Sequence, residues 1–288
     1  MEILGYGLGG VVVADTAHTV RKFYLTEKDG RAEEEHLSYV NDLQKQGFDI
    51  QCVIPQLLEV VGQGRWEVEG KTYVYCNRME RVSGVSARKL LATFSEEATQ
   101  RLGKSLGTSA LAMHRPPKTY IEQWKRKYGT EDIMLAHILN DKARAVLSEN
   151  SDSSATERVA DAARYLKKEC AALASTNTLS HLDFSLANTQ TDLNGRLYGI
   201  VDWGMYGFSN PSLSLYSLTY RTVWPYVRDQ YRQLGGTVRE DIAYAAAAIH
   251  LAWAPLISKQ RDFPLDSDET PENFEVMWKQ FEAHRQSS

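Results

Sequence analysis

Short runs of alternating apolar and polar residues open the chain and predict a β-sheet. The segments EIL, GGVVVAD and TVRKFYL, all within residues 2–25, have the length and composition of strands, with a turn near Thr16 to His18. Further on, WEVEGKTYVYCNRME alternates enough to predict a hairpin whose turn is Glu69-Gly70. The N-terminal part therefore predicts a sheet that is punctuated by glycines.

Apolar residues recur every three or four positions in the rest of the chain, a period that predicts helices. Residues 31–46 form the first such segment, and Gly47 is suited to end it. A second helix is expected after the N-cap residue Ser95. The remaining helical patterns are residues 118–150, an insertion; the segment after Ser154-x-x-Glu157, a capping box; and residues 241–257, apolar nearly all round and so expected in a core.

Composition and charge describe an ordinary soluble globular protein. The 288 residues are 43% hydrophobic and 24% charged, enough for two lobes, and the net charge is −4 with no concentrated basic stripe. We therefore expect no nucleic-acid partner. The three cysteines are far apart and predict reduced thiols. Without a signal segment or a long apolar run, the expected location is the cytoplasm, with no membrane partner.

The glycines of GYGLGGVVV match two nucleotide-binding patterns. Gly5, Gly7 and Gly10 fit G-x-G-x-x-G, which occurs in dinucleotide-binding Rossmann domains and in the phosphate-covering loop of kinases. A Rossmann loop opens a helix, whereas the β-branched run Val11 to Val13 favours a strand. The loop is thus expected to join two strands, with Val12 completing the kinase pattern. A nicotinamide-dependent oxidoreductase is the alternative that this motif alone leaves open.

The most informative chemistry lies in residues 180–204, SHLDFSLANTQTDLNGRLYGIVDWG. Phosphoryl transfer needs a carboxylate that orients the attacking hydroxyl and accepts its proton, and Asp183 suits that role. Mg²⁺ prefers oxygen ligands and retains waters, so Asn188 and Asp202 could hold it. A hairpin turn at Asn194-Gly195 would bring those two residues together.

This block resembles the aminoglycoside phosphotransferase and choline-kinase-like family, in which HGDLHPGN and IDW are typical where this chain has HLDFSLAN and GIVDWG. SALAMH, residues 109–114, resembles the helix before the family's substrate-binding insertion, and the resemblance extends from Gly5 to about Tyr216. On this analogy His181 packs beneath the catalytic loop. The resemblance implies ATP, with GTP as an alternative, and Mg²⁺ as cofactors.

The resemblance also makes demands on the N-terminal part. A lysine on the strand after the glycine hairpin must pair with a helical glutamate, and Lys22 is that lysine. Among Glu33, Glu34 and Glu35, the helical phase favours Glu35, with Glu34 as an alternative. The segment NRMERVSG resembles the family's hinge, where an adenine edge would meet the backbone of Arg78, Met79 and Glu80.

The chain departs from the family pattern at several positions. Asn210-Pro211-Ser212-Leu213-Ser214-Leu215 replaces D-P-x-x-D-L, whose two acids brace the catalytic loop in the family. Leu182 and Ser185 stand where glycine and histidine are common. The lost acids put the rigidity of the loop in doubt, whereas the base and the metal ligands are all present.

The expected fold is α+β, a bilobal protein-kinase-like fold. Residues 1–82 would form an N-terminal nucleotide-binding lobe, an antiparallel sheet with one helix. Residues 83–288 would form a larger, mainly helical lobe for catalysis and substrate binding. A protein substrate is disfavoured, because the short interval from Asp202 to Asn210 leaves no room for a long activation loop.

The expected function is transfer of the γ-phosphate of ATP or GTP to a hydroxyl of a small molecule. An aminoglycoside or another antibiotic is the acceptor that the resemblance suggests, with antibiotic resistance as the role. The acid-rich residues 261–275 could line a pocket for a cationic substrate, but a solvated loop is the favoured interpretation. The alternatives are a metabolic kinase of the choline, ethanolamine or homoserine type and a non-catalytic nucleotide-binding protein. The oligomeric state is left open.

Overall fold

The computed structural model describes residues 2–7, 9–149, 153–261 and 267–286, and the chain packs into two compact units. Unit 1 consists of residues 1–102 and 186–206, and unit 2 of residues 103–185 and 207–288. The boundary expected near residue 82 does not coincide with this division. A hairpin within residues 189–200 pairs with Val85–Ser86 and therefore belongs to unit 1.

Unit 1 contains a five-stranded antiparallel sheet with the strand order β1-β2-β3-β5-β4. The glycine segment joins β1 to β2, so a strand follows the loop and the Rossmann alternative is wrong. The predicted hairpin turn is confirmed, because Glu69 and Gly70 have φ of 49° and 76°, both in the left-handed region. The strands are β1 (Ile3–Gly7), β2 (Gly10–Ala14), β3 (Thr19–Tyr24), β4 (Leu57–Val68) and β5 (Lys71–Glu80).

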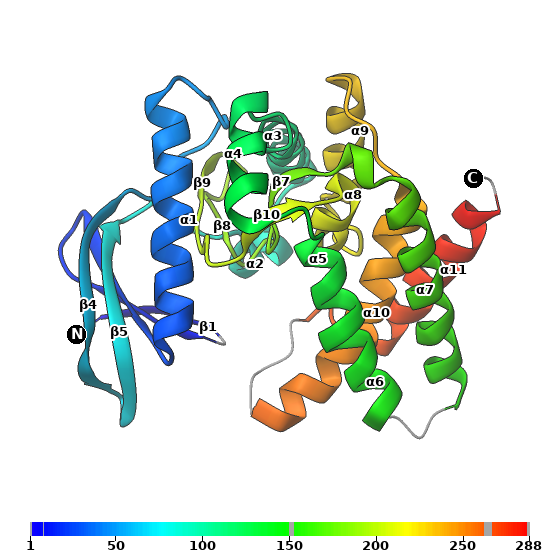
Figure 1. Cartoon of the computed structure of the whole chain (residues 1–288), viewed down its shortest axis with the longest axis horizontal. Coiled ribbons are helices and arrows are strands. Elements are labelled where there is room, and N and C mark those ends of the chain that lie inside the picture. The colour runs from blue at the N-terminus through cyan, green and yellow to red at the C-terminus, as the bar shows by residue number, and fades with distance from the viewer. Residues whose placement is uncertain (1, 8, 150–152, 262–266, 287–288) are drawn as a thin grey trace. The chain divides into compact units, whose positions relative to one another are not determined.

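Helix α1 (Glu27–Lys45) packs against β3, β4 and β5 in unit 1 (Figure 1). It begins four residues before the expected start at residue 31, because Thr26 caps it by accepting a hydrogen bond from the backbone N–H of Asp29. Its C-terminus agrees with the prediction, since Gly47 has a φ of 86°. The buried residues of α1 include Glu33 and Leu37, so Glu33 is the acid of this helix that lies on its buried face.

The rest of unit 1 includes the hairpin that carries part of the predicted site. The order of its three-stranded sheet is β6-β8-β9, and Gly195 lies in the hairpin turn with a φ of 71°. A Cβ atom at Gly195 would lie 2.0 Å from the Ala98 carbonyl oxygen, so this turn requires glycine. The elements are β6 (Val85–Ser86), α2 (Ala87–Leu90), η1 (Leu91–Thr93), β8 (Thr189–Thr191), β9 (Leu197–Ile200) and the start of α3 (Glu96–Met113).

Unit 2 is mainly helical, and α10 (Glu240–Arg261) packs against both α7 (Ser153–Ala172) and α11 (Pro271–Arg285) (Figure 1). Strands β7 (Thr178–His181) and β10 (Tyr206–Ser209) pair with each other. The other elements are α4 (Lys118–Tyr128), α5 (Ile133–Ala136), η2 (His137–Ala143), α6 (Arg144–Glu149), η3 (Ala174–Thr176), α8 (Pro211–Ser214), η4 (Tyr216–Leu218) and α9 (Trp224–Gln233).

Two helices of unit 2 test the sequence predictions. Of the described helices, only α10 is long and apolar enough to cross a membrane, but 67% of its apolar window is buried, as predicted for a core helix. Helix α7 already includes Ser153, so Ser154 lies inside the helix instead of capping it. Residues 150–152 lie outside the described residues.

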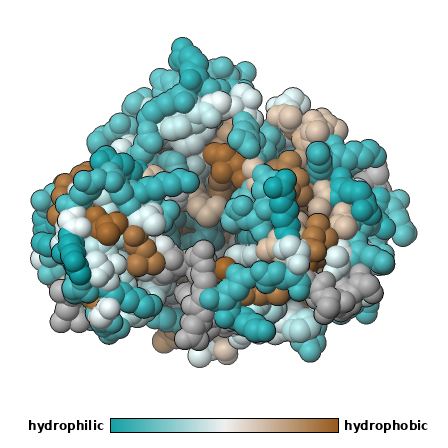
Figure 2. Space-filling model, turned by 60° about the horizontal axis from the view of Figure 1, so that its bottom comes forward, coloured by the Kyte–Doolittle hydropathy of each residue, from teal (hydrophilic) through white to brown (hydrophobic). Residues whose placement is uncertain are grey.

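The face shown in Figure 2 is mainly hydrophilic, with hydrophobic side chains in small groups. Large apolar side chains that are exposed in unit 1 include Leu58 and Val60 on the edge strand β4, at 50% and 43% exposure.

A buried histidine in unit 2 predicts a loss of stability at mildly acidic pH. His114 is 8% exposed, and its ring nitrogens lie 2.8 Å from the Tyr231 hydroxyl and 2.9 Å from the Ser214 hydroxyl. Burial lowers the pKa of His114 to about 3, so the unfolded chain binds a proton near pH 6 that the folded chain does not. The stabilisation is therefore complete above the unfolded pKa and is lost as the pH falls below it.

We expect the stability advantage of the parent over His114→Gln to shrink by about 2 kcal/mol between pH 7 and pH 5. Urea unfolding of both proteins at the two pH values measures this difference. An advantage that stays constant or grows on acidification would show that His114 is already protonated in the folded protein.

Candidate active site

Lys22 lies at the centre of a cluster of charged side chains in unit 1, in which Glu33 is buried and Lys22 is partly buried. Its Nζ atom lies 2.5 Å from Oε2 of Glu33 on α1 and 2.7 Å from Oδ1 of Asp202, which follows β9. Burial alone would lower the pKa of Lys22, but the Asp202 and Glu33 carboxylates outweigh burial and hold that pKa above its usual value. Lys22 is therefore a fixed cation at neutral pH.

The glutamate that pairs with Lys22 is Glu33, which corrects the expectation of Glu35. Glu33 precedes Leu37 by four residues, so both lie on the buried stripe of α1. Glu35 is two positions further on, roughly 200° around the helix, and is only partly buried. Glu34, the alternative, instead accepts a hydrogen bond from the Tyr75 hydroxyl at 2.6 Å. The repeat of four back from Leu37 was the signal in the sequence that identifies Glu33.

Asn188 and Asp202 lie at the open end of the β8–β9 hairpin. The backbone N–H of Val201 donates to the Asn188 carbonyl at 2.9 Å, next to the Thr189–Ile200 pair, so the hairpin brings the two residues together as predicted. Asp202 has a φ of 63°. That left-handed conformation is uncommon for residues other than glycine and occurs often at functional sites.

The chemistry of these two side chains fits Mg²⁺. The Asp202 carboxylate is 41% exposed, and Asn188 offers an amide oxygen from a buried position. Because Mg²⁺ keeps several waters, one or two protein oxygens are enough to bind it beside a phosphate. Within the described ranges, no group of three or more His, Cys, Asp or Glu side chains gathers into a metal site. The role of Asn188 and Asp202 as magnesium ligands stays a prediction.

The glycine loop and the expected hinge both lie at the ends of strands in unit 1. Gly5 pairs with Val12, and Gly7 pairs with Gly10 across the loop. Leu8, between them, lies outside the described residues. A Cβ atom at Gly10 would lie 2.2 Å from the Phe23 carbonyl oxygen, so glycine is needed where β2 meets β3. Val12 in turn pairs with Lys22, which places the loop's strand beside the lysine.

Arg78, Met79 and Glu80 form the end of β5. The backbone N–H of Glu80 donates to the Gln56 carbonyl at 2.9 Å, and the Arg78 side chain donates to Asp15 at 2.8 Å. These residues therefore have partners within unit 1. Contact of this segment with an adenine stays a prediction.

Asp183 belongs to unit 2 and lies on the turn after β7. His181 is fully buried, and its Nδ1 atom accepts a hydrogen bond from the Asp183 backbone N–H at 3.2 Å. This agrees with the prediction that His181 packs beneath the loop. On the same loop, the backbone N–H of Ser185 donates to the Asp183 carbonyl at 2.9 Å.

Hydroxyl groups brace this loop in place of the missing acids. The Ser217 hydroxyl donates to the Phe184 carbonyl at 2.7 Å, and both groups are buried. Asn210 caps α8 by accepting from the Ser212 backbone N–H at 2.9 Å, and Ser214 bonds with His114. Of these hydrogen bonds, the one from Ser217 to Phe184 reaches the loop itself, and the other two hold α8 and His114. A lone serine such as Ser217 gave no signal in the sequence.

A buried lysine that the sequence analysis missed lies in the same unit. Lys142, on the π-helical segment η2, is 3% exposed, and its Nζ atom lies 2.8 Å from the Tyr216 hydroxyl and 2.9 Å from His250 Nδ1. Burial lowers the pKa of Lys142 to about 8, while the Asp183 and Glu269 carboxylates act in the opposite direction. Asp183 is thus close enough to influence this lysine. π-Helical turns are frequent at functional sites.

The acid-rich C-terminal stretch is engaged with the chain's own side chains. Asp262 and Asp266 lie outside the described residues. Among the described acids, Asp268 pairs with Arg221, Glu269 lies 2.9 Å from His250, and Glu275 lies 2.6 Å from Arg158. Arg221 and Arg158 therefore offset the charge of Asp268 and Glu275, whereas burial lowers the pKa of His250 to about 4, so Glu269 has a neutral partner.

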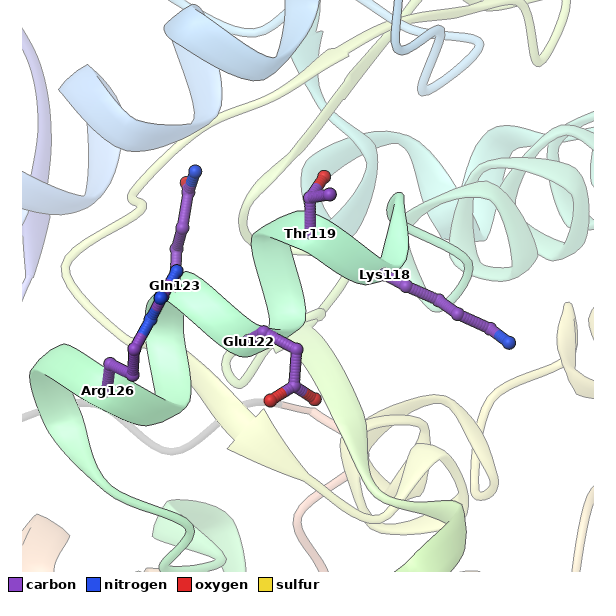
Figure 3. A pocket seen from close by; sticks show the side chains of 5 residues that line it. All are labelled: Lys118, Thr119, Glu122, Gln123 and Arg126. Atoms are coloured by element: carbon purple, nitrogen blue, oxygen red, sulfur yellow. The ribbon is translucent and has the colours of Figure 1, made fainter.

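A separate hollow beside α4 is lined by polar side chains from that one helix, which Figure 3 shows from close by. It contains none of the residues predicted for catalysis or nucleotide binding. Its charged side chains are of both signs. We assign it no chemistry. The lining residues are Lys118, Thr119, Glu122, Gln123 and Arg126.

The fold and the site define a protein-kinase-like phosphotransferase, and comparison with known proteins gives its family. The model of the phosphotransferase enzyme family matches residues 17–282. The chain belongs to that family, and it is a phosphotransferase with an alcohol group as acceptor, as the sequence predicted. A search of curated proteins gave no match.

Solved structures of small-molecule kinases share the fold. The GDP and kanamycin complex of APH(2")-IIIa is 17% identical, with a TM-score of 0.69 over 100% of this chain and 93% of that one. The GDP complex of aminoglycoside 2'-phosphotransferase-IIIa is 16% identical, with a TM-score of 0.62 over 98% and 92%. A choline/ethanolamine kinase family protein from Mesorhizobium loti is 16% identical, with a TM-score of 0.56 over 99% and 87%. The bilobal kinase-like α+β class is thereby confirmed.

Proposed function

We propose that the protein transfers the γ-phosphate of ATP, or of GTP, to a hydroxyl group of a small molecule. The observation that carries this proposal is the partly buried Lys22, which is held between Glu33 and Asp202. A lysine fixed in this way is suited to bind the phosphates of a nucleotide. Nucleotide complexes of structural relatives, with GDP, ADP or ATP, support the same interpretation.

Each residue has one task in the proposed reaction. Lys22 neutralises phosphate charge, Glu33 orients Lys22, and the glycine loop from Gly5 to Gly10 covers the phosphates with its backbone. Asp183 orients the acceptor hydroxyl and accepts its proton as the oxygen attacks phosphorus. Asn188 and Asp202 would hold Mg²⁺, which offsets the charge of the phosphates when it is bound.

The proposed acceptor is a hydroxylated antibiotic of the aminoglycoside kind, with resistance as the role. Structural relatives that were solved with kanamycin, streptomycin or gentamicin support this acceptor class. The second candidate is a metabolic alcohol of the choline or ethanolamine kind, which the relative from Mesorhizobium loti supports. Both acceptors require the same base and the same nucleotide site.

A screen for ADP release separates the acceptor classes. Purified protein with Mg·ATP is incubated with aminoglycosides, cyclic-peptide antibiotics, choline, ethanolamine, homoserine and sugars, each at matched concentration. We expect release well above the acceptor-free rate with at least one antibiotic. Release only with a metabolic alcohol would assign the metabolic role. Binding of Mg·ATP without stimulation by any acceptor would favour a non-catalytic nucleotide-binding protein and contradict the proposal.

A further inference from the structure

Tyr24 contacts the same carboxylate oxygen that holds Lys22. It follows Lys22 by two residues on β3, so the two side chains leave the same face of the strand. The Tyr24 hydroxyl donates to Oε2 of Glu33 at 3.0 Å, and Lys22 Nζ lies 2.5 Å from that oxygen. Tyr24 is 2% exposed and Glu33 is 1% exposed, so bulk water cannot supply the hydrogen bond if either side chain is removed.

Asn77 fixes the direction of this hydroxyl. It is fully buried on β5, and its Nδ2 atom lies 3.4 Å from the Tyr24 hydroxyl and 3.1 Å from the Gly30 carbonyl on α1. The amide donates to both oxygens, which leaves the Tyr24 proton to point at Glu33. Burial and the Glu33 charge also raise the pKa of Tyr24 well above its usual value, so the hydroxyl stays protonated.

We propose that Tyr24, oriented by Asn77, is a positioning residue that holds the Glu33 carboxylate in place for Lys22. Without the Tyr24 hydroxyl, Oε2 of Glu33 keeps the Lys22 amine but loses its second donor, and the glutamate side chain gains freedom to rotate. The Lys22 amine also contacts Asp202, so two carboxylates compete for it. A Glu33 carboxylate that stays in place fixes the position from which the amine binds a phosphate. The inference rests on the proposed function, because it gives Lys22 a phosphate to bind.

The structure supplies a matched control for the test. Tyr75, on β5, also donates its hydroxyl to an acid of α1, at 2.6 Å from Glu34, but that acid does not contact Lys22. Tyr24→Phe and Tyr75→Phe each remove one hydroxyl between the sheet and α1. Calorimetric titration of Mg·ATP and steady-state kinetics are measured for both variants, and thermal unfolding shows that each remains folded.

We expect Tyr24→Phe to raise both the Kd and the KM for ATP about tenfold, which corresponds to the loss of one buried charge-assisted hydrogen bond. Tyr75→Phe should stay within about twofold of the parent, and the KM of the acceptor should not change in either variant. In a Lys22→Met background, Tyr24→Phe should add almost nothing, because its effect acts through Lys22.

Three outcomes would overturn the inference. The first is an unchanged Kd in Tyr24→Phe while the parent binds ATP. The second is an equal loss in Tyr75→Phe. The third is a full additional loss in the Lys22→Met background, which would mean a merely structural role. A parent protein that binds neither ATP nor GTP would overturn the proposed function itself, so the two failures are distinguishable.

Discussion

Asp183→Asn is expected to lower kcat about a thousandfold and to leave the affinity for Mg·ATP within about twofold of the parent. The amide keeps the shape of the side chain and can still contact a hydroxyl, but it cannot accept a proton. The contacts of Lys22 with Glu33 and Asp202 do not involve Asp183, so the change leaves both partners of the lysine in place. Steady-state ADP release measures kcat, and calorimetric titration measures the affinity for Mg·ATP.

Asp141→Asn is the matched control for this experiment. Asp141 is also an acid of unit 2 that acts on Lys142, but its side chain is 64% exposed and contacts His137. We expect at most a twofold change in its kcat. If Asp183→Asn turned over as fast as Asp141→Asn, a base role for Asp183 would be wrong. If Asp183→Asn lost ATP binding as well, the loss of turnover would reflect misfolding.

Glu33→Gln is expected to lower kcat/KM for ATP about a hundredfold, because it leaves Lys22 with only the Asp202 carboxylate as a charged partner. Burial raises the pKa of Glu33, and the Lys22 cation opposes that rise, so the charge of Glu33 depends on its partner. Loss of one member of such a pair is costly, and the neutral amide cannot anchor the amine. Steady-state kinetics with varied ATP measure the effect.

Glu35→Gln makes the comparison decisive, since it removes an acid of the same helix two residues away. We expect kcat/KM within about twofold of the parent, because Glu35 lies off the stripe that faces Lys22. A loss in Glu35→Gln as large as that in Glu33→Gln would restore the pairing first expected from the sequence. No loss in either variant would mean that Lys22 does not need a helical glutamate.

The elements with strong local signals were predictable from the sequence. Glu69-Gly70 and Gly195 require positive φ, so both hairpins could be placed by turn chemistry alone. The sequence predicted the start of α1 at residue 31, four residues after its true start. The first turn is polar and contains Gly30, so it has neither an apolar stripe nor high helix propensity. The cap at Thr26 was the signal that could have corrected it.

The candidate site was predictable where residues lie close in sequence or follow a spacing. Asn188 and Asp202 are joined by one hairpin, which the pattern of residues 188–202 already indicated. Glu33 was marked in the sequence by its spacing of four before Leu37. Tyr24 depends on how α1 packs against the sheet, and Lys142 and Ser217 depend on packing within unit 2. Such tertiary contacts leave no fixed spacing in the sequence.

Transfer of a radiolabelled γ-phosphate from ATP to a hydroxylated acceptor tests the central claim most directly. The reaction is run with Mg²⁺ and the best acceptor from the ADP-release screen, and the labelled product is separated from phosphate. The proposed reaction predicts label in the acceptor with the parent and with Asp141→Asn, and none above background with Asp183→Asn. Label that appears only as free phosphate, or that reaches the acceptor equally well with Asp183→Asn, would contradict it.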